Sequence, residues 1–210
     1  MTAAYFSAAI PEPYRILALQ LKPLSLGRYR LMHRFDVAFV ADEETLPGFQ
    51  DLIVGVSICS MRCDDFLAWW GTKKFHRDMR KWSKRLCPGQ WIGRIPILGK
   101  WWMARHGIDV PQKLALFGKY ISEGSEVPKF WDLTGGGSAS GAHWAQAVEV
   151  ILRGELGWTR DEINEEPLSK ALSDYFKWME NKGLIQLMTE NDLDLIRILE
   201  TAGGENGIRA

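Results

Sequence analysis

Two cysteines four residues apart are the first side chains whose type and spacing suit chemistry. Cys59 and Cys63 would share one face of a helix, and two thiolates are half of a tetrahedral zinc site. The nearest further ligands are His76, Cys87 and His106, and their spacing matches no zinc motif. A buried cysteine most often serves as a small hydrophobic residue, so the sequence predicts no metal site.

Nucleophilic catalysis would need a serine or cysteine beside an oriented base. The sequence contains no Gly-x-Ser-x-Gly turn, and its four histidines are scattered along the chain: His33, His76, His106 and His143. Nothing in the sequence pattern brings these histidines together. We therefore predict no catalytic residues and no cofactor, and we expect a protein that is not an enzyme.

Glycine-rich and acidic motifs also lack the context that catalysis requires. Residues 135–137 are three glycines, but no Gly-Lys-Ser/Thr follows them and no parallel-strand pattern precedes them, as a phosphate-binding loop would need. The adjacent carboxylates of Asp64 and Asp65 fit a solvated helix edge. Those of Glu165 and Glu166 fit a helix N-terminus, where the helix dipole favours acids.

Charge is distributed unevenly along the 210 residues. The 26 lysines and arginines balance the 26 aspartates and glutamates, which argues against a dedicated nucleic-acid binder, usually a basic protein. Residues 72–106, the basic Trp-rich segment, nevertheless hold ten Lys/Arg and one acid, whereas residues 155–200 hold eleven Asp/Glu and five Lys/Arg. The basic Trp-rich segment supplies our candidate partner-binding residues: Lys73, Lys74, Arg77, Arg80, Lys81, Trp82, Lys84, Arg85, Trp91, Trp101 and Trp102.

Four interpretations of the basic Trp-rich segment remain open. Its cations and rings suit contact with nucleic acid, an interfacial helix on a membrane, or docking of an acidic partner, including the acidic part of this chain. Alternatively, the tryptophans belong to the core and the cations to a solvated face, which is the commonest origin of a charged run. Glycine and proline within residues 91–107 interrupt the helix that a membrane binder would favour, so partner docking is the favoured functional interpretation.

Helical periodicity dominates the N-terminal part of the chain. Ser25 is placed to cap a helix, and apolar spacing predicts further helices over residues 49–70, 73–86 and 110–122. Residues 35–40 fit either a strand or the end of a helix. The fold class is therefore predicted to be all-α (mainly α), an irregular helical bundle.

A Gly/Ser-rich stretch marks the best candidate boundary. Glycine has the most backbone freedom to lose on ordering, so residues 123–142 are predicted to form a flexible linker. The linker would separate a mainly helical N-terminal region, residues 1–122, from a C-terminal three-helix module, residues 143–203. Caps are expected in that module at Thr159 and Pro167.

The expected compartment is the cytoplasm. The sequence has three cysteines and no N-terminal signal pattern, which argues against a disulfide framework. Its most apolar stretch, residues 52–61, is much shorter than the roughly 20 residues of a membrane-spanning helix. We therefore expect no transmembrane segment.

Several short motifs resemble a known family. They are Leu21-Lys22-Pro23-Leu24-Ser25-Leu26-Gly27, Pro128-Lys129-Phe130-Trp131, His143-Trp144, Glu155-Leu156-Gly157-Trp158-Thr159, Asp161-Glu162-Ile163 and Glu166-Pro167-Leu168. Together they resemble motifs of tail assembly chaperone-like proteins of tailed phages and prophages. The resemblance covers residues 17–36 and 128–183, and the basic Trp-rich segment departs from it.

The resemblance implies a non-catalytic phage morphogenesis protein of the bacterial host cytoplasm. Its implied partner is the tape-measure protein or another tail protein, bound before the tail tube polymerises, and a homo-oligomer is compatible with the sequence. Two alternatives remain: a structural virion component, such as a connector or tail-completion protein, and a nucleic-acid-associated protein with a basic face.

Overall fold

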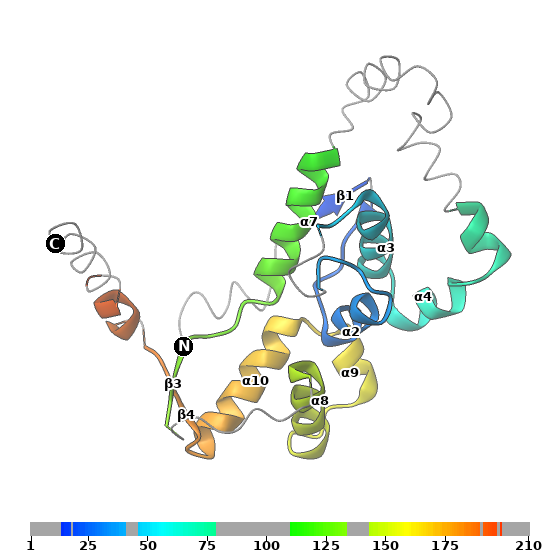
Figure 1. Ribbon diagram of the computed structural model, residues 1–210. Coiled ribbons are helices and arrows are strands. Elements are labelled where there is room, and N and C mark those ends of the chain that lie inside the picture. The colour runs from blue at the N-terminus through cyan, green and yellow to red at the C-terminus, as the bar shows by residue number, and fades with distance from the viewer. Residues whose placement is uncertain are drawn as a thin grey trace, which may run out of the picture.

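The computed structural model is mainly helical, which confirms the predicted fold class (Figure 1). It describes residues 14–40 except 18, 46–78, 110–133, and 143–198 except 190 and 197. The helices with defined bounds are α2 (Leu26–Arg34), α3 (Phe49–Ser60), α4 (Cys63–Trp69), α7 (Val110–Gly124), α8 (Trp144–Gly154), α9 (Arg160–Glu165) and α10 (Leu168–Asn181). Short strands are β1 (Arg15–Ile16), β2 (Leu19–Gln20), β3 (Phe130–Asp132) and β4 (Ile185–Leu187).

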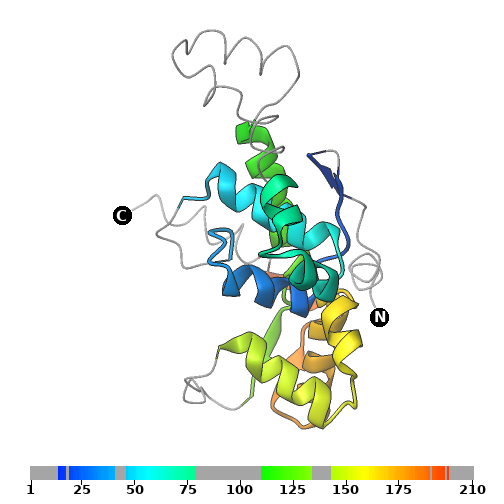
Figure 2. The same cartoon turned by 90° about the vertical axis from the view of Figure 1, so that its right-hand side faces the viewer.

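Helix α2 begins where the sequence predicts. The Ser25 backbone is extended, and its hydroxyl accepts a hydrogen bond from the Arg28 N–H, so Ser25 is the N-cap. The helix ends at Arg34 with Phe35 as its C-cap, and residues 35–40 contain turns and no strand. In both views α8, α9 and α10 lie on one side of α2, and α3 and α7 lie on the other (Figures 1 and 2).

The predicted helix over residues 49–70 is two helices. Helix α3 ends at Ser60, and the extended backbone of Met61 and Arg62 separates it from α4. The chain therefore turns between Cys59 and Cys63, and the expectation that these thiols share one helix face is wrong. Both side chains are buried and free.

The helices after residue 143 carry the expected start and stop signals. Thr159 and Glu162 form a reciprocal capping box at the start of α9, and Pro167 is the residue before the first turn of α10. Gly183 ends α10 with φ of 70°, and the N–H groups of Gly183 and Leu184 donate to the carbonyls of Glu180 and Met179. This pair of bonds is the usual glycine-dependent helix stop.

The predicted linker contains regular structure in its first half. Helix α7 extends to Gly124, and β3 pairs with β4 in antiparallel register, with Trp131 opposite Gln186. Strand pairing across such a distance in the chain leaves no local periodicity from which it could be predicted. The three glycines at residues 135–137 lie outside the described residues.

One continuous core joins the two parts of the chain. Buried apolar side chains of α2, α3, α4 and α7 pack in the same cluster as those of α8, α9 and α10. Helix α2 supplies Leu26, Leu31 and Met32 to it, and α10 supplies Leu168, Leu172 and Phe176. None of the helices within the described residues combines the length and apolar character needed to cross a membrane.

Candidate functional site

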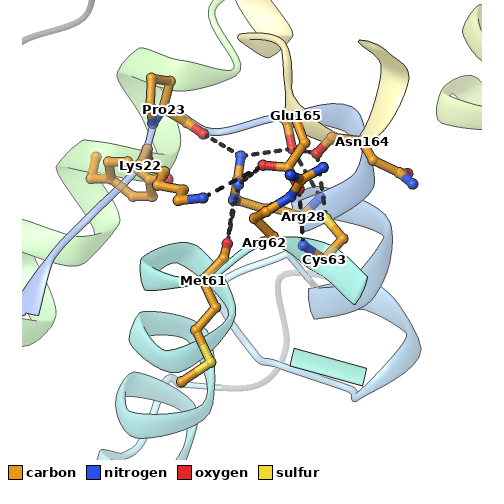
Figure 3. Close-up of polar contacts among 10 residues, drawn as sticks. Lys22, Pro23, Arg28, Met61, Arg62, Cys63, Asn164 and Glu165 are labelled. Carbon is orange, nitrogen blue, oxygen red and sulfur yellow. Dashed lines mark hydrogen bonds and ion pairs between the residues drawn. The ribbon is translucent and has the colours of Figure 1, made fainter. Parts of the chain in front are cut away.

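Arg28 on α2 is the one charged residue among the buried residues that the structure describes (Figure 3). Its side chain is fully buried, and each of its three nitrogens donates a hydrogen bond. Nε and Nη2 donate to the carbonyl of Met61 at 3.3 and 3.1 Å, and Nη1 donates to the carbonyl of Pro23 at 3.1 Å. Nη2 also donates to the Glu165 carboxylate at 2.5 Å. A buried guanidinium needs this saturation because an unpaired charge in the interior is strongly unfavourable.

Glu165, the last residue of α9, is the counter-charge. Its Oε1 accepts a hydrogen bond from the Cys63 N–H at 3.0 Å, at the start of α4. Lys22 and Arg62 lie 3.8 and 4.0 Å from its carboxylate oxygens. Burial raises the pKa of Glu165, but the Cys63 N–H and the Arg28 and Lys22 charges outweigh burial, so the net pKa lies below its ordinary value.

Helices α2 and α9 are in close contact through hydrogen bonds and through the backbone. The Ser25 hydroxyl donates to the Asn164 carbonyl at 2.5 Å, and a β-bridge joins Ser25 to Pro167. A Cβ added at Gly27 would lie 2.7 Å from the Cα of Asn164, so only glycine fits there. We refer to Ser25, Gly27, Arg28, Asn164 and Glu165 as the α2–α9 joint. The joint links three helices, because the Cys63 N–H at the start of α4 donates a hydrogen bond to Glu165.

The two described cysteines are poorly suited to nucleophilic catalysis. Burial raises the pKa of Cys59 to about 12 and that of Cys63 to about 11. Both thiols are therefore protonated at neutral pH, and the thiolate is the reactive form. The Cys63 thiol donates a hydrogen bond to the Asn164 carbonyl at 3.3 Å, which is a packing role at the joint. Within the described residues no group of three or more His, Cys, Asp and Glu side chains is arranged to hold a metal ion.

Most of the partner-binding residues proposed from the sequence lie outside the described residues: Arg80, Lys81, Trp82, Lys84, Arg85, Trp91, Trp101 and Trp102. The others, Lys73, Lys74 and Arg77, lie on the helical stretch of residues 73–78, and all three are exposed. Arg77 lies 3.8 Å from the carboxylate of Asp78. These three cations are accessible to a partner, but the described structure brings none of the eleven residues together in a site.

Two of the scattered histidines meet in space. His143, the N-cap of α8, lies with its ring centroid 4.9 Å from that of His33 on α2. Its Nδ1 accepts a hydrogen bond from the Ala145 N–H at 3.2 Å, and the Tyr29 ring packs at a tilt against Trp144, with ring centroids 4.9 Å apart. Capping and ring packing account for the cluster, which fixes the N-terminus of α8 against α2.

Exposed apolar side chains gather on β3. Phe130 packs against Phe176 of α10, with ring centroids 5.1 Å apart. Side chains alternate between the two faces of a strand, which places Trp131 on the face opposite Phe130. Leu133, the residue after β3, has its N–H bonded to the Leu184 carbonyl and continues this alternation. The exposed fractions of Trp131 and Leu133 are 47% and 56%, which is high for such large apolar groups. We refer to Trp131 and Leu133 as the β3 outer face.

Sequence reasoning missed both the joint and this face. Arg28 and Glu165 are two charges among 52, and nothing local links residues so far apart in the chain. The nearest signals were the Ser25 cap, the glycine at position 27 and the proline at position 167, all of which lie at the joint. Trp131 lies in the predicted linker, and the motif Pro128-Lys129-Phe130-Trp131 is the sequence signal that marks it.

Comparisons with protein-family models, curated proteins and solved structures found no match to this chain. The described residues provide a joint whose buried polar groups are paired and an exposed aromatic face.

Proposed function

We propose that the protein is a tail assembly chaperone of a tailed phage or prophage, which binds the tape-measure protein in the host cytoplasm before the tail tube polymerises. It acts without catalysis. The observation that carries the proposal is the α2–α9 joint. The two segments that resemble the family, residues 17–36 and 128–183, form the two sides of this joint. Motifs far apart in the chain that meet at one site fit a shared fold better than chance similarity does.

Several of the quoted motifs have structural roles at or near the joint. Residues 21–27 hold the Ser25 cap and Gly27, and the Leu24 carbonyl accepts a hydrogen bond from the Leu168 N–H at 2.6 Å. Thr159 caps α9, and Pro167 bridges to Ser25. These roles support a common scaffold, in which the motifs maintain the shape that presents the binding surface.

The β3 outer face is the surface that we assign to the client. Exposed, adjacent aromatic and aliphatic side chains on a small soluble scaffold are typical of protein-binding sites. Trp131 and Leu133 would pack against the apolar stripe of an amphipathic helix, as expected for a long helical client that is prone to aggregate. Phe130 anchors the strand to α10, so the face is held on a fixed base.

Co-expression with the tape-measure protein tests the proposal. We expect the tagged chain to capture the client, and the Trp131→Ala, Leu133→Ala double variant to reduce capture about tenfold or more, since buried aromatic anchors dominate interface energies. The matched control is Leu46→Ala with Val150→Ala, which removes exposed apolar side chains elsewhere and should leave capture unchanged. Equal capture by all three proteins would contradict the assigned surface.

Purified particles separate the chaperone from its alternatives. A chaperone leaves the assembly, so its peptides should be absent from mature virions. Their presence at stoichiometric levels would instead identify a structural virion component. A salt-dependent change in DNA mobility would favour a nucleic-acid-associated protein acting through Lys73, Lys74 and Arg77.

A further inference from the structure

A surface pocket of about 300 Å³ lies between the α8–α9 connection and α10. Leu156 and Trp158 line one side of it, and Gly157 between them has φ of 69°, which turns the chain there. Helix α10 runs alongside α8 and supplies the rest of the lining (Figure 1). Its four lining residues share one helix face, at spacings of three and four: Asp174, Lys177, Trp178 and Asn181. The volume is at the lower end of the range for small-ligand sites, which suits a single side chain.

Among the charged side chains around the pocket, the carboxylate of Asp174 has no ion-pair partner in the part of the chain that the structure describes. Three lysines close to it each have a glutamate partner: Lys170 with Glu166 at 3.1 Å, Lys177 with Glu180, and Lys182 with Glu155 at 3.8 Å. Asp174 forms no ion pair and no hydrogen bond through its side chain with any residue that the structure describes. Its carboxylate is half-buried, and burial raises the pKa of Asp174, with Lys170 offsetting only part of the effect. A cation entering the pocket would relieve this desolvation.

The aromatic walls already hold cations of the chain itself. The Lys170 Nζ lies 5.4 Å from the centroid of the Trp158 ring, and the Lys182 Nζ lies 5.7 Å from that of Trp178. Tryptophan is the best aromatic acceptor for a cation because of the negative potential over its ring face. Two such rings beside a carboxylate favour a positively charged ligand and disfavour an anion.

We infer that this pocket binds an arginine side chain of a protein partner. The guanidinium packs against the indole of Trp158 or Trp178 and donates hydrogen bonds to the Asp174 carboxylate, while the aliphatic part of the arginine lies on Leu156. Arginine fits better than lysine because its planar group stacks on rings and presents paired donors to a carboxylate. The excess of acidic residues over residues 155–200 attracts a basic partner to this side of the protein.

The site is separate from the β3 outer face and does not depend on the identity of the client. A tail assembly chaperone and a virion component would both use it in the same way. Failure of the arginine site would leave the proposed function standing, and failure of the proposed function would leave the pocket chemistry intact.

A nuclear magnetic resonance titration of the full chain with N-acetyl-L-arginine amide tests the inference. This probe presents the side chain as it occurs within a protein. We expect saturable shifts of the Trp158 and Trp178 indole N–H signals, assigned by single tryptophan-to-phenylalanine variants. The neutral isostere N-acetyl-L-citrulline amide should produce no saturable shift, and the matching lysine derivative should bind several-fold more weakly.

Two variants make the test specific. Asp174→Asn keeps the shape of the pocket and should weaken arginine binding about tenfold or more, since hydrogen bonds between charged groups are the strong ones. Asp161→Asn, an exposed carboxylate on α9 outside the pocket lining, should bind like the wild type. Both variants should retain the wild-type circular dichroism spectrum.

Three results would overturn the inference. They are equal binding of the citrulline and arginine probes, unchanged binding by Asp174→Asn, and the absence of saturable indole shifts. Binding of free L-arginine without binding of the blocked derivative would identify a small-molecule site in place of a protein-binding one.

Discussion

Two carboxylates on consecutive helices of the chain have opposite environments. Glu165, at the α2–α9 joint, has a buried arginine, a backbone N–H and two further cations around it, and its pKa is lowered. Asp174, in the pocket beside Trp158 and Trp178, is desolvated without an ion pair from the described residues, and its pKa is raised. Both groups lose water on folding, but only Glu165 recovers the lost interactions within the chain.

This difference separates the parts that hold the fold from the parts that are available to partners. Among the described residues every buried side-chain nitrogen and oxygen has a hydrogen-bond partner. The joint follows this rule strictly, because unpaired buried groups destabilise a fold. At the surface, Asp174 in the pocket lacks an ion pair from the described residues, and the β3 outer face exposes apolar side chains. A partner could supply the missing charge and cover the apolar side chains.

The largest expected effect is the loss of Arg28. Arg28→Met keeps much of the side-chain volume but removes the donors to the carbonyls of Met61 and Pro23 and the buried partner charge of Glu165. We expect the free energy of unfolding to fall by about 3 kcal/mol or more in urea titrations, as for other broken buried pairs. The control is Arg30→Met on the same helix, whose half-exposed ion pair with Glu149 should contribute less than about 1 kcal/mol. Equal losses in the two variants would contradict the special role of the joint.

We expect a smaller loss of stability when Gly27 is replaced. Gly27→Ala places a methyl group 2.7 Å from the Asn164 backbone, and α9 must move away. Overpacking of this kind reduces stability by about 1–3 kcal/mol, so the melting temperature should fall. Gly154→Ala is the control, since a Cβ there meets nothing within 4 Å and alanine favours a helix. It should leave the melting temperature unchanged or raise it. A Gly27→Ala protein as stable as wild type would show that the helices are not in close contact.

The smallest expected effects are on the pH dependence of stability, and their sign differs between Glu165 and Asp174. A lowered pKa at Glu165 adds stability above the ordinary value of 4.5, and this stability is lost as the pH falls through the folded-state value. The advantage of wild type over Glu165→Gln should therefore shrink on acidification. A raised pKa at Asp174 works the other way, because its charged form is disfavoured in the folded protein.

Asp174→Asn should accordingly be more stable than wild type at neutral pH, and the gain should vanish below the ordinary aspartate value of 3.8. Urea unfolding across this pH range measures both variants in one series. If the two variants depart from wild type with the same sign at neutral pH, the contrast between the joint and the pocket is wrong.

Local features of the fold could be predicted from the sequence. The caps at Ser25 and Thr159 depend on residues within three positions of each other, and both are present. The helical stop at Gly183 has the same local origin. Apolar periodicity predicted helical structure over residues 49–70, where the structure has α3 and α4, and over α8, which buries Ala145, Val148 and Leu152 on one face.

Features that depend on distant pairing could not be predicted. At the break between Cys59 and Cys63, the Cys63 N–H donates a hydrogen bond to Glu165, 102 positions later in the chain. Strand β3 exists because β4 pairs with it, and the partners His33 and His143 meet only when α8 docks on α2. A single sequence records which residues can make such contacts but not which ones do.

Hydrogen–deuterium exchange of the chain, alone and in complex with the tape-measure protein, distinguishes a structural joint from a binding surface. We expect slower exchange on binding at residues 130–133 and 184–187, around the β3 outer face, with unchanged exchange at the amides of Arg28, Cys63 and Glu165. Protection confined to the α2–α9 joint, or no protection on β3 in a complex that forms, would contradict the division between a structural joint and a binding surface.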